Sequence, residues 1–234
     1  MNIYEILPKA YDIGDGERVA VYVCGCSYFK CPFCFNRMIQ DPSAGHKYTE
    51  EDKKLIFKYL DALSIKNITI LGGEPLDPVN LPEVTALCKE LKERYSEINI
   101  WVYSGYEYDI IKNLDIIKYI DCLKCGRYIQ EYNDGTSVFC GSTNQYIVDV
   151  KKSSAQNKLI YWHDFEGNPM GPGKYKPLSI SSDTELLNEL IKAIKNNKST
   201  VCRDSSEYGK GLTAAYGNVL DYYEHLRKIK ERIN

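Results

Sequence analysis

The sequence predicts an α/β fold built on a mostly parallel sheet. Short runs rich in β-branched and aromatic residues alternate with amphipathic helical segments along the first half of the chain. Strands that alternate with helices form parallel sheets, because each helix crosses over from one strand to the next. The chain has 234 residues, of which 44% are hydrophobic, and this is enough for a sizeable core.

Charge and composition argue against several classes of protein. The formal net charge is −2, so no basic field favours nucleic acid or an anionic membrane as a partner. The N-terminus has no basic flank followed by an apolar run, and no apolar stretch approaches the ~20 residues of a membrane span. Nine cysteines suit a reducing compartment, where they act as metal ligands or buried side chains rather than as disulfides. We therefore expect a cytoplasmic protein.

The first predicted strand, residues 19–24, is followed by a loop with several cysteines. Thr49 opens the first helix, with Asp52 three residues later as its capping partner. The apolar residues of this helix recur on one face: Leu55, Ile56, Tyr59, Leu60 and Leu63. The run "NITIL", residues 67–71, predicts the second strand.

Asn80 and Pro82 start the second helix. Its apolar face is expected to carry Val84, Leu87, Cys88 and Leu91. The third strand covers residues 98–103, and a short helix near 107–113 leads to a fourth strand around 119–123. Ligands of parallel sheets collect at the carboxyl ends of the strands. The cysteine loop, "GGEP" (72–75) and "SGY" (104–106) follow the first three strands, so we expect them to converge on one site.

Cys26, Cys31 and Cys34 have the spacing C-x4-C-x2-C, which is short enough to wrap one ion or cluster. Cys24 belongs to the preceding strand, and we interpret it as a buried strand residue. A structural zinc site or a closed iron–sulfur cluster needs four protein ligands. A set of three therefore either borrows a distant ligand or leaves a metal position open for chemistry. A four-cysteine zinc knuckle that includes Cys24 is the alternative.

Five phrases in order resemble the blocks of one known family: "GCSYFKCPFCFN", "ITILGGEPLDPVN", "IWVYSGY", "YIDCLKCGRYIQE" and "GSTNQYIVDVKKS". They are similar to the radical S-adenosylmethionine (SAM) activases of anaerobic (class III) ribonucleotide reductase. The resemblance covers roughly residues 15–153. It implies a partial (βα) barrel-like parallel sheet of the radical SAM type, with an activase core over residues 1–153.

The resemblance also implies the cofactors and the residues that hold them. Cys26, Cys31 and Cys34 would be the catalytic cysteines that bind three irons of a [4Fe–4S] cluster, and SAM would chelate the fourth. Phe33 matches the aromatic position where the backbone meets the adenine, and the Gly72–Glu74 turn receives the methionine amino group. The residues expected to bind the cofactor are Phe33, Cys34, Phe35, Asn36, Gly72, Gly73, Glu74 and Ser104.

The implied activity is that of an oxidoreductase that installs a glycyl radical. The reduced cluster would cleave SAM, and the resulting 5′-deoxyadenosyl radical would take hydrogen from a glycine of the reductase. The implied partners are the catalytic subunit of the anaerobic reductase and a low-potential electron donor such as flavodoxin. Two other hypotheses stay open: a radical SAM enzyme that acts on a small molecule, and a zinc-stabilised interaction protein.

The chain departs from the family pattern at two places. The family usually has three residues between the first two cysteines, and here Ser27–Lys30 makes four. Cys125 stands where the family tends to carry Asp, and Cys122 precedes it in a C-x2-C pattern that is either a metal or redox pair or two thiols without function. Residues 154–234 fall outside the resemblance and are expected to form an extension of a linker plus helices, including a capping box at Ser182 and Glu185.

Overall fold

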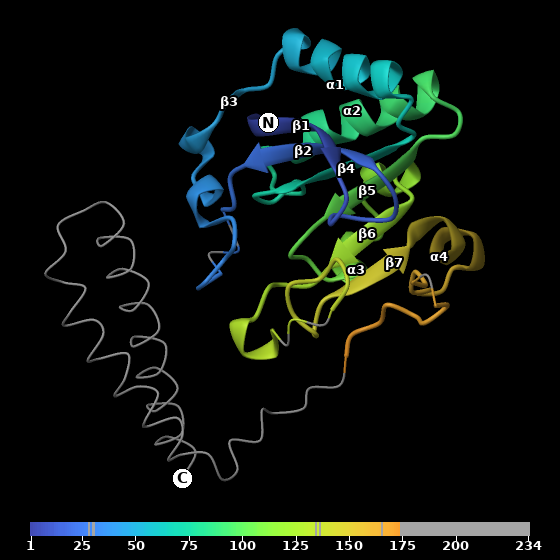
Figure 1. The fold of residues 1–234 in the computed structure, drawn as a ribbon. Coiled ribbons are helices and arrows are strands. Elements are labelled where there is room, and N and C mark those ends of the chain that lie inside the picture. The colour runs from blue at the N-terminus through green and yellow to red at the C-terminus, as the bar shows by residue number, and fades with distance from the viewer. Residues whose placement is uncertain (28, 30, 134, 136, 165, 174–234) are drawn as a thin grey trace, which may run out of the picture. The chain divides into compact units, whose positions relative to one another are not determined.

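The computed structural model describes residues 1–173 except 28, 30, 134, 136 and 165 (Figure 1). The predicted helices of the C-terminal extension, with the capping box at Ser182 and Glu185, lie outside the described residues. No helix among the described residues is long and apolar enough to cross a membrane.

The described residues form a mixed seven-stranded sheet in the order β3-β1-β2-β4-β5-β6-β7. Its centre is the parallel set β2 (Arg18–Cys24), β4 (Asn67–Gly72), β5 (Asn99–Tyr103) and β6 (Cys122–Cys125). The prediction of an α/β fold with parallel strands is thus confirmed. Three antiparallel strands at the edges were not predicted: β1 (Asn2–Ala10), β3 (His46–Lys47) and β7 (Tyr146–Asp149).

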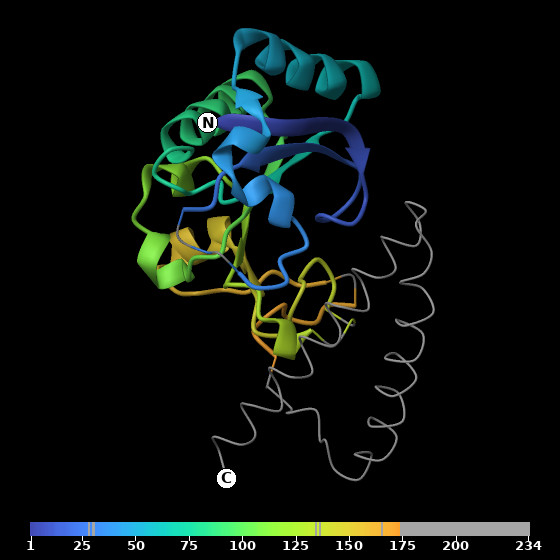
Figure 2. The ribbon, with the colours of Figure 1, turned by 90° about the vertical axis from the view of Figure 1, so that its left-hand side faces the viewer.

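Helices α1 (Glu50–Leu63) and α2 (Leu81–Arg94) lie close together beside the sheet (Figures 1 and 2). Thr49 and Asp52 form the predicted capping box of α1. The residues buried in α2 are the predicted set Val84, Leu87, Cys88 and Leu91. They pack on one face of the sheet in the main hydrophobic core. Strand side chains alternate between the two faces of a sheet, so every second strand residue points toward these helices.

Shorter helices lie in the connections between strands and, in the case of α4, after the last strand. These are α3 (Tyr108–Ile111), α4 (Val150–Gln156) and the 3-10 turns η1 (Arg37–Gln40), η2 (Pro42–Ala44), η3 (Asp115–Lys118) and η4 (Gln130–Tyr132). α3 and η3 lie between β5 and β6, where a short helix was predicted.

The other face of the sheet carries two smaller apolar clusters, one around Ala20 and Leu71 and one around Trp101 and Cys122. Near the amino ends of the parallel strands, this face also holds Arg18, which is fully buried. Its guanidinium lies over the ring of Trp101 and donates hydrogen bonds to the backbone oxygens of Asp15, Ile68 and Asn99. Arg18 therefore fixes the strand register at the end of the sheet opposite the loops that follow β2, β4 and β5.

After α4 the chain returns along β7. Tyr161 forms an antiparallel bridge with Val148, and Trp162 packs edge-to-face on Trp101 at 5.1 Å between ring centroids. The backbone amide of Ile147 donates to the oxygen of Met170 at 2.9 Å. The division of the chain at residue 153 stays a prediction, but Tyr161, Trp162 and Met170 beyond it pack against the core clusters of the sheet.

Candidate functional site

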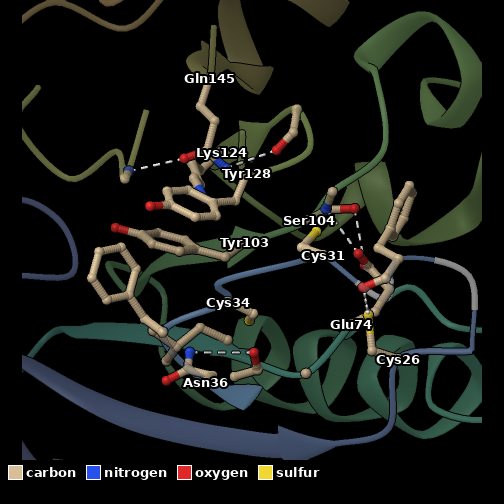
Figure 3. Close-up of a pocket in the computed structure, with 18 of the residues that line it drawn as sticks. Cys26, Cys31, Cys34, Asn36, Glu74, Tyr103, Ser104, Lys124, Tyr128 and Gln145 are labelled. Carbon is tan, nitrogen blue, oxygen red and sulfur yellow. Dashed lines mark hydrogen bonds between the residues drawn. The ribbon is translucent and has the colours of Figure 1, made fainter. Parts of the chain in front are cut away.

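A pocket of about 220 Å³ lies at the carboxyl ends of β2, β4, β5 and β6 (Figure 3). The predicted convergence of the three loops is confirmed, and the segment after β6 joins them. The lining residues come from these four strand ends and from the loop before β7: Cys26, Phe29, Cys31, Cys34, Phe35, Asn36, Gln40, Leu71, Gly72, Gly73, Glu74, Tyr103, Ser104, Gly105, Lys124, Gly126, Tyr128, Phe139, Gly141 and Gln145.

All three predicted cysteines line this pocket, in spite of the extra residue between Cys26 and Cys31. Cys26 is the most buried of them, and its thiol donates to the oxygen of Phe29 at 3.2 Å. Burial raises the pKa of Cys26 to about 12, so without a metal this residue stays a thiol. Cys24 does not line the pocket and is a buried strand residue, as predicted.

The base of the cysteine loop is closed by backbone hydrogen bonds. Gly25 donates to the oxygen of Ile39 at 2.9 Å, and Cys26 donates to that of Gln40 at 3.0 Å. Gly25 has a φ of 96°, a left-handed conformation that glycine adopts without strain. The two bonds bring the start of the loop against η1, so the loop between them projects over the strand ends.

Three thiols on one pocket are the ligand set of a cluster that leaves one iron open. In a [4Fe–4S] cluster each thiolate binds a different iron, so the ligands surround the cluster instead of meeting at a point. Structural zinc needs four ligands around one point, and Cys24, the fourth cysteine of the zinc hypothesis, is buried outside the pocket.

The turn after β4 packs directly against the cysteine loop. Gly73 donates to the oxygen of Val23 at 2.8 Å, and Glu74 donates to that of Gly25 at 2.7 Å. A Cβ at Gly73 would lie 2.4 Å from the Gly25 oxygen, and one at Gly72 would lie 2.8 Å from the Val23 oxygen. Both glycines are therefore required by the close approach of two backbone segments, whatever ligand the turn receives.

Glu74 links the ends of β4 and β5. Its carboxylate accepts hydrogen bonds from the Ser104 hydroxyl at 2.9 Å and from the backbone amides of Gly105 at 2.8 Å and Leu76 at 2.9 Å. Burial raises the pKa of Glu74 to about 7, and the three hydrogen bonds act against that rise. The hydrogen bond between Ser104 and Glu74 thus joins the ends of β5 and β4 in the pocket wall.

Of the remaining residues predicted to bind the cofactor, two line the pocket and one does not. Asn36 and Phe35 line the pocket, and the Asn36 amide donates to the oxygen of Gly72 at 3.4 Å. Phe35 is 73% exposed and lies 5.3 Å from the ring of Tyr128. Phe33 does not belong to the pocket lining, and it has a left-handed φ of 61°. Its predicted contact with adenine is a backbone contact, which stays a prediction.

Sequence reasoning missed the contribution of β6 and of the segment directly after it, whereas the "GSTNQ" phrase (141–145) was expected near this edge of the sheet. Lys124 and Tyr128 line the pocket, as does Gln145 of the "GSTNQ" phrase. The Gln145 side chain donates to the oxygen of Gly126 at 2.8 Å and accepts from the amide of Gly141 at 2.9 Å. Placing the fourth strand at 122–125 instead of 119–123 would have brought Lys124 into the predicted site.

Cys122 and Cys125 do not form a pair. Cys122 packs with Trp101 on one face of the sheet, whereas Cys125 belongs to the main core on the other. Cys125 lies three positions after Cys122 in the strand, an odd offset, so their side chains point to opposite faces of the sheet. The hypothesis of an extra metal or redox pair is therefore wrong, and the expectation that the two thiols have no function stays a prediction.

Fold and pocket together define a class of protein, in which a cysteine-lined pocket at the carboxyl ends of parallel strands holds an iron–sulfur cluster. The sequence model of the 4Fe-4S single cluster domain family matches residues 13–148, more than half of the chain. Three curated relatives are named anaerobic ribonucleoside-triphosphate reductase-activating protein. The one from Enterobacteria phage T4 is 36% identical over 146 residues, covering 62% of this chain and 92% of the relative.

The relative from Vibrio cholerae is 33% identical over 154 residues, and the one from Escherichia coli K12 is 28% identical over 151. Each alignment covers 63% of this chain and 97% of the relative. The chain therefore belongs to the 4Fe-4S single cluster domain family and to the family of these activating proteins.

Proposed function

We propose that this protein activates an anaerobic ribonucleotide reductase by generating a glycyl radical on it, with a [4Fe–4S] cluster and SAM as cofactors. The observation that supports this most is the set of three cysteines, not four, from one loop on one pocket. When bound, the reduced cluster supplies one electron to SAM, whose carbon–sulfur bond breaks to give methionine and a 5′-deoxyadenosyl radical that takes a hydrogen atom from the reductase glycine.

Cys26, Cys31 and Cys34 would hold the cluster as thiolates. Binding it would require the Cys26 thiol to release a proton that burial otherwise retains. The Gly72–Glu74 turn would receive the methionine amino group beside it. Ser104, which we expected to touch the cofactor, would instead position Glu74 through their hydrogen bond.

The openness of the site supports a protein substrate. A carbon radical attacks almost any C–H bond, so water and stray groups must be excluded when it forms. Phe35 lines the pocket and is largely exposed, which leaves an apolar surface at the rim. We propose that the glycine-bearing segment of the reductase covers this rim and is both substrate and lid.

We propose further that the sheet is a partial (βα) barrel of the radical SAM type, because its parallel strands carry helices on one face and the pocket at their carboxyl ends. The electron would come from a low-potential donor such as flavodoxin. A cytoplasmic location is proposed because the cysteines of the described residues are free thiols, which a reducing compartment maintains.

Electron paramagnetic resonance on reduced, cluster-loaded protein with SAM and a cognate reductase tests the proposal. We expect a doublet glycyl radical signal that requires all three components. Turnover of a free small molecule without a protein radical would favour the small-molecule alternative. Colourless protein with bound zinc and no affinity for SAM would favour the interaction protein.

A further inference from the structure

Lys124 is a cation in the wall of the pocket that the proposed function does not yet use. It lies in β6 beside Tyr103 of β5 in parallel register, and both side chains face the pocket (Figure 3). The ammonium of Lys124 is 5.0 Å from the centroid of the Tyr103 ring. This cation–π contact fixes the position of the charge but does not neutralise it.

Lys124 has no carboxylate partner within ion-pair distance among the described residues. The other half-buried lysine near this strand, Lys92, pairs with Asp121 at 2.7 Å. Glu74 also lines the pocket and attracts Lys124 at longer range, but its oxygens accept three hydrogen bonds from other groups. Burial lowers the pKa of Lys124, and an anionic ligand group beside it would act against that lowering and stabilise the ammonium.

A charged donor without an anionic partner in a binding pocket is suited to an anionic ligand group. In SAM, the sulfonium carries positive charge, and the adenine and ribose are neutral. The α-carboxylate is its one anionic group, so it is the part of the ligand that a lysine attracts.

We propose that Lys124 binds the α-carboxylate of SAM and orients the amino-acid end of the molecule in the pocket. This inference rests on the proposed function. It adds a residue of β6 to a binding site otherwise assigned to the cysteine loop and to the ends of β4 and β5. Lys124 would then act on the ligand rather than on the cluster.

The test compares two ligands on anaerobically reconstituted protein. Dissociation constants are measured by equilibrium dialysis for SAM and for decarboxylated SAM, which lacks the carboxylate but keeps the sulfonium and nucleoside. In Lys124→Met we expect the affinity for SAM to fall roughly 10- to 100-fold, the range of a hydrogen bond to a charged group, and that for decarboxylated SAM to stay unchanged. Lys124→Arg should restore part of the loss.

Lys118→Met is the matched control, because Lys118 is exposed, lies outside the pocket lining and pairs with Asp115. Iron content and the spectrum of the cluster without SAM report on any effect on the cluster itself, and we expect neither to change in Lys124→Met. Equal loss of affinity for both ligands, or no loss for either, would overturn the inference. So would a shifted cluster spectrum with the carboxylate preference intact, which would make Lys124 a counter-charge to the cluster. Failure of the wild-type protein to bind SAM would instead overturn the proposed function.

Discussion

The carboxylate of Glu74, at the end of β4, accepts a hydrogen bond of 2.9 Å from the hydroxyl of Ser104, at the end of β5. Both side chains are almost completely buried. A buried carboxylate that faces neutral donors keeps its proton more readily than one in water, and the pKa of Glu74 is accordingly raised to about 7. The link between the two strand ends is therefore sensitive to pH.

The titration of Glu74 should lower the free energy of unfolding of the protein as pH rises from about 4.5 to about 7. In that window the folded state keeps the Glu74 proton that the unfolded chain has lost, so raising the pH favours unfolding. Glu74→Gln removes the titration. The thermal midpoint of the wild type relative to this variant, measured anaerobically on cluster-loaded protein, should drop between pH 5 and pH 8 by several degrees, since about 1 kcal/mol corresponds to 2–4 °C. Parallel pH profiles would show that Glu74 does not titrate in this range.

Substituting the cysteines one at a time should distinguish those that bind the cluster from those that do not. Cys26→Ala, Cys31→Ala and Cys34→Ala should each lose the brown colour and most of the iron, because each removes one thiolate. Cys24→Ala serves as the control and should retain about four irons per chain. Iron analysis and visible absorption after anaerobic reconstitution make the measurement. Bleaching by Cys24→Ala but not by Cys26→Ala would reverse the assignment.

Gly73→Ala should disturb the cysteine loop as well as the turn that contains it. The added Cβ would meet the Gly25 oxygen at 2.4 Å, so the backbone must shift, at a cost of about 1–3 kcal/mol. We expect lower stability and reduced iron content. Gly135→Asn is the control, because a Cβ there meets no atom of the described residues within 4 Å and Asn tolerates the left-handed φ of 69°. Full iron content in Gly73→Ala with weaker binding of SAM alone would mean that the turn serves only the ligand.

The effect of truncation should depend on whether residues 153–173, which include the end of α4, remain. A chain that ends after residue 173 keeps the contact of Trp162 with Trp101 and the hydrogen bonds along β7, and should still hold the cluster. A chain that ends at residue 152 loses them and should be less stable, with the loss of the tryptophan contact alone costing on the order of 2 kcal/mol. Denaturant unfolding of both chains measures the difference. Equal stability would indicate that the folded core ends near residue 153.

Periodicity was sufficient to predict elements that bury a single face. The buried residues of α2 follow from its sequence because a helix on a sheet must turn one apolar stripe inward. β1 was missed for the opposite reason. Its pairing with β2 is interrupted by two register shifts, and it contains Pro8, so it shows no alternation of polar and apolar residues.

The parts of the site that were predictable are those formed by short motifs directly after a predicted strand. Three cysteines and a double-glycine turn after successive strands indicated one pocket. Lys124 and Tyr103 could not be found this way, because their proximity depends on the register of β5 against β6. That register is set by the long-range hydrogen bonds of the sheet, and a shift of one residue would turn Lys124 to the other face.

The two hydrogen bonds that close the base of the cysteine loop have a consequence for how the loop can evolve. Because Gly25 and Cys26 are tied to Ile39 and Gln40, a residue gained or lost between Cys26 and Cys31 changes the path of the loop without displacing β2 or η1. Far from the loop, Arg18 independently holds the strand register. The length of this loop can therefore vary while its two ends stay fixed, and residues 27–36 are the segment to exchange between homologues in a chimera.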